Sequence, residues 1–486
     1  MISGNNRPGL GLSLVPIFVL IGLLILNITL FKDSATLGPN QLALLIAGLV
    51  AGGIGIFVLK VPYKHLEERV IHSISLSMQA NLILLVVGVL IGLWIFSGVV
   101  PAMIYYGIRL INPVWFLPIT CVVCAVVSLA TGSSWSTGGT VGIALMGVGE
   151  ALGVPTGMVA GAVISGAYFG DKMSPLSDTT NLAPAMAGAD LFVHIRYMLF
   201  TTGPSILIAL IGYSLLGIFY QGKLVELGQI KLITHLIQEQ FHITPFLFLL
   251  PALVFFLVAK KVPALGALII GSIGGAVFII IFQQELLSRM LGSEVSFLGI
   301  YSKIMQVAHA GFELQTGNKV IDNLLSRGGM ASMLNTVWLI LMAMVFGGLM
   351  EASGMLQIIA QSILKLVRGA ASLMTATISS CIVLNLSASD QYISLVVPGK
   401  MFKPSYDKFG LAPQNLSRSL EDGGTITSVL IPWNTCGAYF STILGVSTGA
   451  YLPFCFFNLI NPLIGILVAN LDWNIAKIEH KADVLD

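Results

Sequence analysis

The sequence has little charge. Asp, Glu, Lys and Arg make up only 9% of its 486 residues, whereas about a quarter of the residues of a soluble domain are charged. Hydrophobic residues make up 56%, and the mean hydropathy is +0.92. Most of the chain therefore cannot face water. A net charge of +2 with dispersed basic residues gives no reason to expect a nucleic-acid partner.

Cysteine and catalytic motifs are also scarce. Of five cysteines, Cys121 and Cys124 form a CxxC inside an apolar run with no histidine nearby, which favours packing over a metal or redox site. The sequence contains neither an H-E-x-x-H motif nor a Walker A motif. A membrane metalloprotease and an ATP-driven pump are therefore disfavoured. We expect no enzyme activity and no cofactor.

What the sequence has in abundance is apolar runs of about 20 residues, long enough to cross a ~30 Å hydrocarbon layer. They predict an all-α polytopic membrane protein with about 11–12 transmembrane helices, the first retained rather than cleaved. The predicted spans are Leu12–Phe31, Asn40–Leu59, Gln79–Val99, Pro113–Ala130, Gly157–Ala183, Leu191–Tyr220, Pro245–Ala259, Pro263–Phe282, Ala331–Ser353, Ala370–Leu386, Leu411–Tyr439 and Ala450–Asn470.

The two halves of the chain resemble each other. The segment Gly92–Gly98 matches Gly348–Gly354 at an offset of 256 residues, since 354 − 98 = 256. The same offset places Ser133 on Ser389, and it places Asp178-Thr179 on Asn434-Thr435. Small-residue motifs are common where membrane helices pack, which is the alternative explanation. Three separated matches at one offset favour an internal duplication.

This duplication divides the chain into four parts. We expect an N-terminal extra helix (1–31), a first repeat half (32–242), linker spans with a connector (243–330) and a second repeat half (331–486). The hydrophilic stretch Gln283–Arg327 is too short to bury its own core. We therefore expect it to be a connector that the transport chemistry does not need.

Each half carries a Ser-rich break followed by a helix interrupted by Gly or Pro. The breaks are Thr131–Gly139 and Gly170–Asn181 in the first half, and Ser387–Gln391 and Glu421–Thr435 in the second. At membrane depth, unwound backbone is tolerated only where it is buried in protein or lines a cavity. Its carbonyls, with Ser, Thr and Asn oxygens, could then bind a Na⁺-sized ion. Turns in solvated loops are the alternative.

The segment Gly170–Ala185 (GDKMSPLSDTTNLAPA) resembles the most recognisable stretch of the NhaC family of Na⁺/H⁺ antiporters, within a larger ion-transporter superfamily. The segments Thr131–Gly139 and Pro432–Thr435 are similar to that family too. The resemblance implies inverted repeats with re-entrant hairpins. It also implies a secondary active transporter that exchanges Na⁺ for H⁺ across the cytoplasmic membrane of the cell. Some members of this family exchange both ions together with an organic anion.

The alternative function is therefore a Na⁺/H⁺-coupled exchanger of small carboxylates, of the malate/lactate type, or of amino acids. An ion channel is a third class, which duplicated broken helices fit less well. The expected partners are the lipid bilayer, a monovalent cation and, in the alternative, a small organic anion. Whether the chain forms a homodimer stays open.

Antiport needs a group that holds either a proton or a cation, but never both. A carboxylate in a partly dehydrated cavity suits this role, because desolvation raises the pKa of a carboxyl group from about 3.9 towards neutrality. Asp178 is the first choice, and Asp171 is the second, unless Lys172 pairs with Asp171 and makes it structural. Arg418 is a possible ion-pair partner for the acidic residues of the second half.

The complete set of proton- or cation-binding candidates is Asp178, Asp171, Thr179, Thr180, Asn181, Ser133, Ser134, Asp390, Ser389, Glu421, Asp422, Asn434 and Thr435. We expect the site to lie between Ser133, Asp178, Ser389 and Asn434, with Asp178 and Asn434 as Na⁺ ligands.

The predicted pairing of Asp178 with Asn434 leaves one titratable carboxyl beside one amide, which allows a single choice between proton and cation. Asp178→Asn should therefore keep the fold but abolish proton-coupled cation exchange, measured as Na⁺-driven pH changes in liposomes. Asn434→Asp should instead shift the pH profile or the stoichiometry, because a second carboxylate adds a proton site. Near-normal exchange by Asp178→Asn would move the proton-binding role to Asp171 or Asp422.

Overall fold

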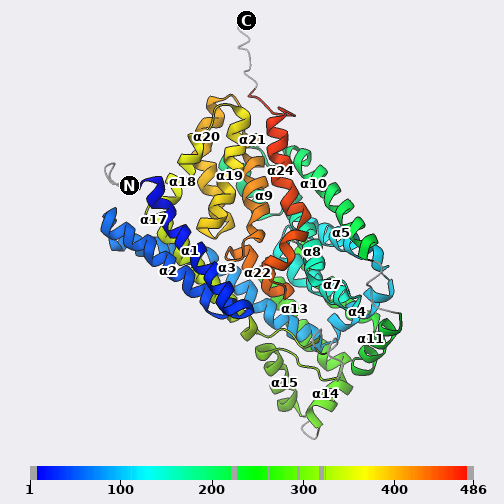
Figure 1. Cartoon of the computed structure of the whole chain (residues 1–486). Helices are drawn as coiled ribbons and strands as arrows, with labels where there is room; N and C mark the ends of the chain where they lie inside the picture. The colour runs from blue at the N-terminus through cyan, green and yellow to red at the C-terminus, as the bar shows by residue number, and fades with distance from the viewer. Residues whose placement is uncertain are drawn as a thin grey trace.

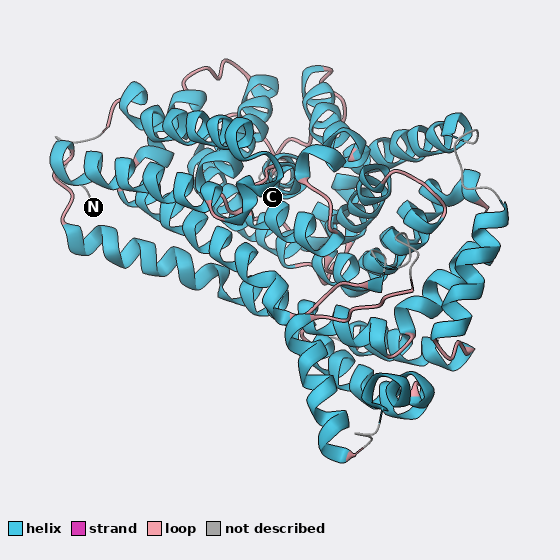
Figure 2. Cartoon of the chain, turned by 60° about the horizontal axis from the view of Figure 1, so that its bottom comes forward, coloured by secondary structure: helices cyan, strands magenta, loops and turns pink. Residues whose placement is uncertain are grey.

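The computed structural model describes residues 8–110, 112–220, 227–260, 262–292, 296–316, 322 and 325–478. These residues form helices joined by turns and loops, and their only β feature is one isolated bridge between Leu411 and Lys477. Figure 2 shows the chain as a bundle of helices, which confirms the all-α fold.

The first half contains α1 (Leu10–Phe31), α2 (Pro39–Gly53), α3 (Tyr63–Phe96), α4 (Val99–Leu110), α5 (Phe116–Thr131), α6 (Ser134–Thr137), α7 (Ile143–Ala151), α8 (Thr156–Met173), α9 (Asp178–Ala187) and α10 (Leu191–Tyr220). The middle contains α11 (Leu227–Gln240), α12 (Leu249–Ala259), α13 (Ala264–Phe282), α14 (Gln284–Leu291) and α15 (Phe297–Ala310).

The second half contains α17 (Leu334–Ala352), α18 (Met355–Leu364), α19 (Ala370–Ala388), α20 (Gln391–Lys408), α21 (Pro413–Leu420), α22 (Thr435–Leu444), α23 (Thr448–Tyr451) and α24 (Phe456–Asn470). Short 3₁₀ or π turns extend these helices: η1 (Lys32–Leu37), η2 (Ile54–Val58), η3 (Pro113–Trp115), η4 (Gly138–Gly142), η6 (Pro245–Phe248), η8 (Met330–Met333), η9 (Glu421–Thr425), η10 (Ser428–Leu430) and η11 (Leu452–Phe454).

Helix α3 runs through the middle of the molecule. It packs against α17 and α13, while α2 and α1 cover α17 and α18 on one side and α5, α8 and α10 form the other side (Figure 1). Most outward-facing side chains of α1 and α10 are apolar, as for Phe18 and Leu207, although Arg196 on α10 is also exposed. An apolar outer surface around a packed interior is what a lipid environment requires.

Eight described helices are long and apolar enough to cross a membrane, or ten if each of two sharply bent pairs counts as one span. The sequence predicted 11–12 spans, and this count by length and apolarity leaves out two of them, Gly157–Ala183 and Leu411–Tyr439. The predicted spans Gly157–Ala183 and Leu411–Tyr439 are each interrupted, at Ser174–Ser177 and at Ile431–Asn434, so neither is one continuous helix. The breaks themselves were correctly predicted.

Three helices of the first half and three of the second begin at matched positions. Helix α20 begins 257 residues after α6 (391 − 134 = 257), and the same offset separates the starts of α21 and α8 and the starts of α22 and α9. Nearer the start of the two halves, Gly98 and Gly354 both adopt positive φ at the predicted offset of 256. The offset thus grows by one residue along the chain. These matches support a duplication, while the two repeated halves stay a prediction.

The connector is more deeply packed than expected. Phe312 and Leu325 are buried in the main core, and the Gly329 amide donates to the Gly88 carbonyl of α3 at 2.7 Å. A guanidinium N–H of Arg327 donates to Glu150 at 2.7 Å. Since α3 also lines the cavity described below, the end of the connector supports a cavity wall. That the chemistry does not need the connector stays a prediction.

The closest helix pair is α5 with α8, and it depends on small residues. A Cβ atom added at Gly166 would lie 2.1 Å from the Cys121 carbonyl oxygen, and one at Gly170 would lie 2.3 Å from the Ala125 carbonyl oxygen. The Ser128 hydroxyl donates to the Ala167 carbonyl at 2.6 Å across the same interface. This contact fixes α8, which carries Asp171, against the first break.

Gly166→Ala should therefore destabilise the protein by about 1–3 kcal/mol, because the added methyl group forces two packed backbones apart. Thermal unfolding in detergent measures the effect. Gly203→Ala is the matched control, since a Cβ atom on this glycine of α10 meets nothing within 4 Å. Equal melting temperatures for the two variants would contradict this account of the interface.

Candidate functional site

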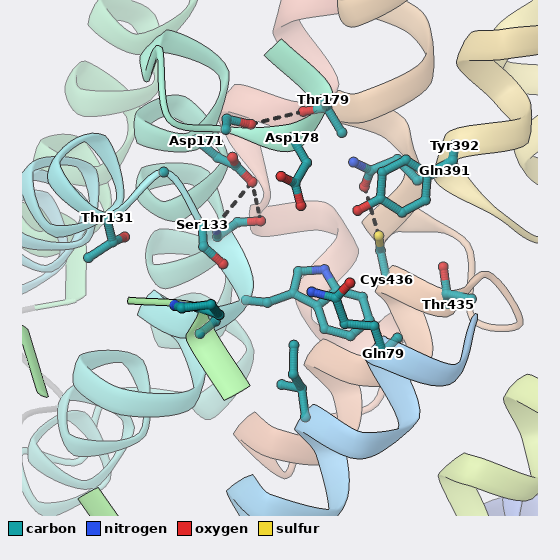
Figure 3. A pocket seen from close by; sticks show the side chains of 18 of the residues that line it. Gln79, Thr131, Ser133, Asp171, Asp178, Thr179, Gln391, Tyr392, Thr435 and Cys436 are labelled. Atoms are coloured by element: carbon teal, nitrogen blue, oxygen red, sulfur yellow. Dashed lines mark hydrogen bonds between the residues drawn. The ribbon is translucent and has the colours of Figure 1, made fainter. Parts of the chain in front are cut away.

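The two halves meet around a cavity of about 650 Å³. Its polar wall comes from the helix breaks, and its other walls come from α3 and from the α12–α13 turn. Figure 3 shows Asp171, Ser133 and Asp178 together, with Gln391, Tyr392 and Cys436 opposite them. The lining residues are Leu76, Ser77, Gln79, Ala80, Ile83, Thr131, Gly132, Ser133, Ser134, Trp135, Asp171, Leu176, Ser177, Asp178, Thr179, Val258, Val262, Pro263, Ala264, Asp390, Gln391, Tyr392, Thr435 and Cys436.

Four helices begin at this cavity, and each is capped by a polar side chain. Ser133 Oγ accepts from the Ser136 amide at 3.1 Å, and Ser177 Oγ accepts from the Thr180 amide at 3.4 Å. In the second half, Asp390 Oδ1 accepts from the Ile393 amide at 3.0 Å, and Asn434 Oδ1 accepts from the Cys436 amide at 3.1 Å. The caps satisfy amides that the breaks leave without helical partners.

The chain reverses direction at each Ser-rich break through a left-handed residue. Gly132 has φ +68°, and Ser389, at the matched position 257 residues later, has φ +60°. The two breaks of the second half are tied together here, because the Thr435 amide at the start of α22 donates to the Ser389 carbonyl at 3.0 Å. The breaks are therefore buried polar structure, which is what the sequence predicted, and not loop tips in solvent.

Three carboxylates line the cavity. Asp171 is almost buried and accepts from both the hydroxyl of Ser134, at 2.6 Å, and its amide, at 3.0 Å. Asp390 is also buried, while Asp178 is exposed on the wall. Helix N-termini carry partial positive charge, which these carboxylates offset. The result is a compact set of hard oxygen atoms around a space that a small cation can enter.

The hydrogen bond between Ser134 and Asp171 has a counterpart in the other half. At an offset of 257, Ser134 corresponds to Gln391 and Asp171 to Ser428, and the Ser428 hydroxyl donates to Gln391 Oε1 at 2.9 Å. The matched pairs Ser133/Asp390, Asp171/Ser428 and Asp178/Thr435 each contain one carboxylate. A charge in one half is thus matched by a neutral oxygen in the other.

Seven of the predicted site residues line the cavity: Ser133, Ser134, Asp171, Asp178, Thr179, Asp390 and Thr435. Of the others, Thr180 donates to the carbonyls of Asp171 and Lys172, and Asn181 donates to the Pro175 and Ser177 carbonyls. These two residues hold the break in shape and do not line the cavity.

Ser389 and Asn434 sit one residue away from the lining and are fully buried. The Asn434 amide group is already engaged, since its nitrogen donates to Asn385 and its oxygen caps α22. Asn434, the second predicted Na⁺ ligand, therefore acts as the N-cap of α22 in the structure. By position in its helix, Asn434 corresponds to Ser177, and Asp178 corresponds to Thr435, one residue off the predicted register.

Glu421 and Asp422 lie outside the cavity, on η9. Asp422 forms a buried ion pair with Lys172, so Lys172 does not pair with Asp171 as the alternative interpretation supposed. Arg418 lies 3.9 Å from Asp422, which is one of the pairings considered from the sequence.

Within the described residues, no three His, Cys, Asp or Glu side chains come together as a transition-metal site would require. Oxygen ligands such as those that line the cavity suit hard cations.

Comparisons with known proteins show the family of the chain. The model of the Na⁺/H⁺ antiporter family matches residues 166–473. The malate-2H(+)/Na(+)-lactate antiporter of Bacillus subtilis is 38% identical over 92% of each chain. The chain belongs to the Na⁺/H⁺ antiporter family. A second relative in this comparison, the Na(+)/H(+) antiporter NhaC of Alkalihalophilus pseudofirmus, is 35% identical over 99% of each chain. The arginine/ornithine antiporter ArcD of Halobacterium salinarum is 32% identical over 96% of this chain and 93% of its own.

For this member of the Na⁺/H⁺ antiporter family, sequence reasoning missed several lining residues. Gln391, Tyr392 and Cys436 stand directly beside predicted residues, so their proximity to the breaks could have indicated them. Gln79 gave no such signal, because it lies on α3, far from any break. Trp135 stacks on Tyr439 with ring centroids 4.0 Å apart, an aromatic contact between the halves that the sequence does not show.

Ser134→Ala should weaken Na⁺ binding by roughly tenfold or more, because a hydrogen bond to a charged group contributes about 1.5–3 kcal/mol and stabilises the ionised form of Asp171 that a cation needs. The Na⁺ dependence of exchange in liposomes measures this. Ser136→Ala is the matched control, since the Ser136 hydroxyl, on the same short helix, has no hydrogen-bond partner among the described residues. An unchanged Na⁺ affinity in Ser134→Ala would exclude Asp171 as a cation ligand.

Proposed function

We propose that this protein is a secondary active transporter that exchanges Na⁺ for H⁺ across the cell membrane. The observation that carries the proposal is the cavity of about 650 Å³ at which four interrupted helices begin and which Asp171, Asp178 and Asp390 line. Irregular backbone and carboxylates inside an otherwise apolar bundle are expensive, and they are kept where ions bind.

The cavity carboxylates are the groups that alternate between proton and cation. When ionised, Asp171 is held by Ser134 and can share a cation with Asp178. The hydroxyl groups of Ser133 and Thr179 add neutral oxygens, and such groups can rotate to present a lone pair. Protonating a carboxylate removes the charge that a cation needs, so the two ions compete for the same site.

The matched helix starts support a transport cycle in which the two halves move relative to each other around the cavity. Helices α6 and α9 of the first half face α20 and α22 of the second, each pair at the same offset of 257 residues. Interrupted helices at a repeat interface are characteristic of carriers that work by alternating access. Family membership and the near-complete alignment with NhaC support the same function.

A second candidate function is exchange of a small organic acid or amino acid together with Na⁺ and H⁺. The observation that favours it is the size of the cavity, since about 650 Å³ is far more space than a single cation fills and lies within the ~300–1,000 Å³ of small-molecule sites. The relatives named for malate and lactate and for arginine and ornithine point to the same alternative.

Proteoliposomes loaded with a pH indicator distinguish the two functions. For Na⁺/H⁺ exchange, external NaCl alone should raise the internal pH, because Na⁺ entering the liposomes drives protons out, with no need for an organic solute. Li⁺ and K⁺ serve as comparison cations. A pH change only when malate, lactate or arginine is also present would favour the second candidate, and no pH response under any condition would exclude both.

A further inference from the structure

A group of four charged residues lies outside the cavity and inside the protein. Lys172, Arg418, Glu421 and Asp422, here called the Lys172 cluster, all have side chains that are fully buried. They come from α8, α21 and η9, and none of them lines the cavity. Four buried charges are expensive unless they are paired, so their arrangement is informative.

Asp422 is the best satisfied member of the Lys172 cluster. It accepts from the Lys172 ammonium, and from the Thr201 hydroxyl at 3.1 Å. Lys172 also donates to Asn461 Oδ1 at 2.9 Å. The Arg418 guanidinium lies 3.9 Å from the other Asp422 oxygen and 4.8 Å above the centre of the Tyr197 ring.

Arg418 Nε and Nη1 and Asp422 Oδ2 have no hydrogen-bond partner among the described residues, and Glu421 is the least satisfied member of the cluster. Neither of its carboxyl oxygens has a hydrogen-bond partner among the described residues, and the Thr425 hydroxyl one turn later is also unpartnered. An ionised carboxylate without donors is strongly disfavoured in a dry interior. On these grounds alone, Glu421 would keep its proton.

The net charge of the other three residues of the cluster favours the opposite state, in which Glu421 is ionised. With Glu421 neutral, Lys172 and Arg418 outnumber Asp422, so the cluster carries one uncompensated positive charge. Ionising Glu421 would cancel that charge. The state of Glu421 thus depends on a balance between missing donors and excess positive charge, and a modest change in nearby charge can shift it.

The cavity supplies such a change. Asp171 and Lys172 are consecutive residues in the last turn of α8, with Asp171 on the cavity and Lys172 in the cluster. While the cavity holds no cation, those of its three carboxylates that stay ionised add negative charge next to the cluster and favour the protonated form of Glu421. A cation in the cavity cancels that negative field.

We propose that Glu421 is a proton-binding site separate from the cation cavity, which releases its proton when a cation occupies the cavity. The O–H bond of the Glu421 carboxyl breaks, the proton passes to water, and the carboxylate that remains neutralises the Lys172 cluster. This proton is additional to the one exchanged in the cavity, and it competes with the cation without sharing its site. This inference rests on the proposed Na⁺/H⁺ exchange.

We attribute the protonation balance of Glu421 to the charges of the Lys172 cluster and of the cavity. Helix α24 packs on η9 and contributes no ionisable side chain, only the amides of Asn458 and Asn461 at this depth. The remaining titratable groups on the elements packed against η9 are Asp178 on α9, Cys381 on α19, Asp390 at the start of α20, and six residues of α20. These six are Tyr392, Lys400, Lys403, Tyr406, Asp407 and Lys408, of which Tyr392, Lys400, Asp407 and Lys408 are exposed.

The first experiment counts the protons that purified protein releases when NaCl is added in weakly buffered detergent, which needs binding but no transport. Wild type should release more protons per bound Na⁺ than Glu421→Gln, with a difference approaching one, while Glu421→Asp should retain the release. Glu351→Gln is the matched control, because Glu351 is a partly exposed carboxyl that pairs with Arg69 at the surface. Equal proton release by wild type and Glu421→Gln would overturn the proposal.

The second experiment uses the wild-type chain, so it does not depend on a variant that folds. Infrared difference spectra upon Na⁺ addition, with ¹³C-labelled glutamate, should show the loss of a protonated glutamic acid band. Glu421 is the only fully buried glutamate among the described residues, so such a band identifies it. Changes in aspartic acid bands alone would overturn the proposal, whereas no Na⁺-induced change and no proton release would instead contradict the proposed exchange itself.

Discussion

The cost of an interrupted backbone inside a membrane is the constraint on which the rest of this structure depends. Each interruption leaves amide groups that no lipid can satisfy. Here the caps Ser133, Ser177, Asp390 and Asn434 satisfy them, and the Thr435 amide reaches across to the Ser389 carbonyl. Because the interruptions are satisfied from within the protein, they can meet in one place and enclose a polar cavity.

The position of the carboxylates follows from the same constraint. Helix starts bring positive potential to the cavity, and acidic side chains beside them are favoured there. Each matched pair around the cavity has one carboxylate and one neutral oxygen, which limits like-charge repulsion. Helix α8 connects the cavity to the buried charges. Asp171 faces the cavity, and the next residue, Lys172, is paired with Asp422 in the interior.

Much of the fold could be predicted because a membrane makes simple demands on a sequence. Low charge and long apolar runs predicted the helical membrane fold, and Ser-, Gly- and Pro-rich interruptions predicted the broken helices. The sequence predicted more spans than the eight to ten long apolar helices because Gly157–Ala183 and Leu411–Tyr439 are apolar on both sides of their breaks. Hydrophobicity alone does not show whether a helix continues through such a break.

About half of the candidate site residues line the cavity. There is a physical reason why the others do not. A helix start faces a cavity with only some of its residues, so the neighbours Ser389 and Asn434 turn inward while Asp390 and Thr435 face it. Gln79 reaches the cavity from α3, whose sequence has no feature that indicates a site.

The sequence by itself determined that this protein spans a membrane, where its helices break, and which oxygen-bearing residues gather at the breaks, since these depend on local hydrophobicity and backbone preference. Only the tertiary structure decided which residues share a site. Lys172 follows Asp171 in the sequence, yet it pairs with Asp422, 250 residues away, because successive side chains of a helix point about 100° apart. That rotation, together with the packing of α8 between the two halves, separates the cation cavity from the buried charged cluster.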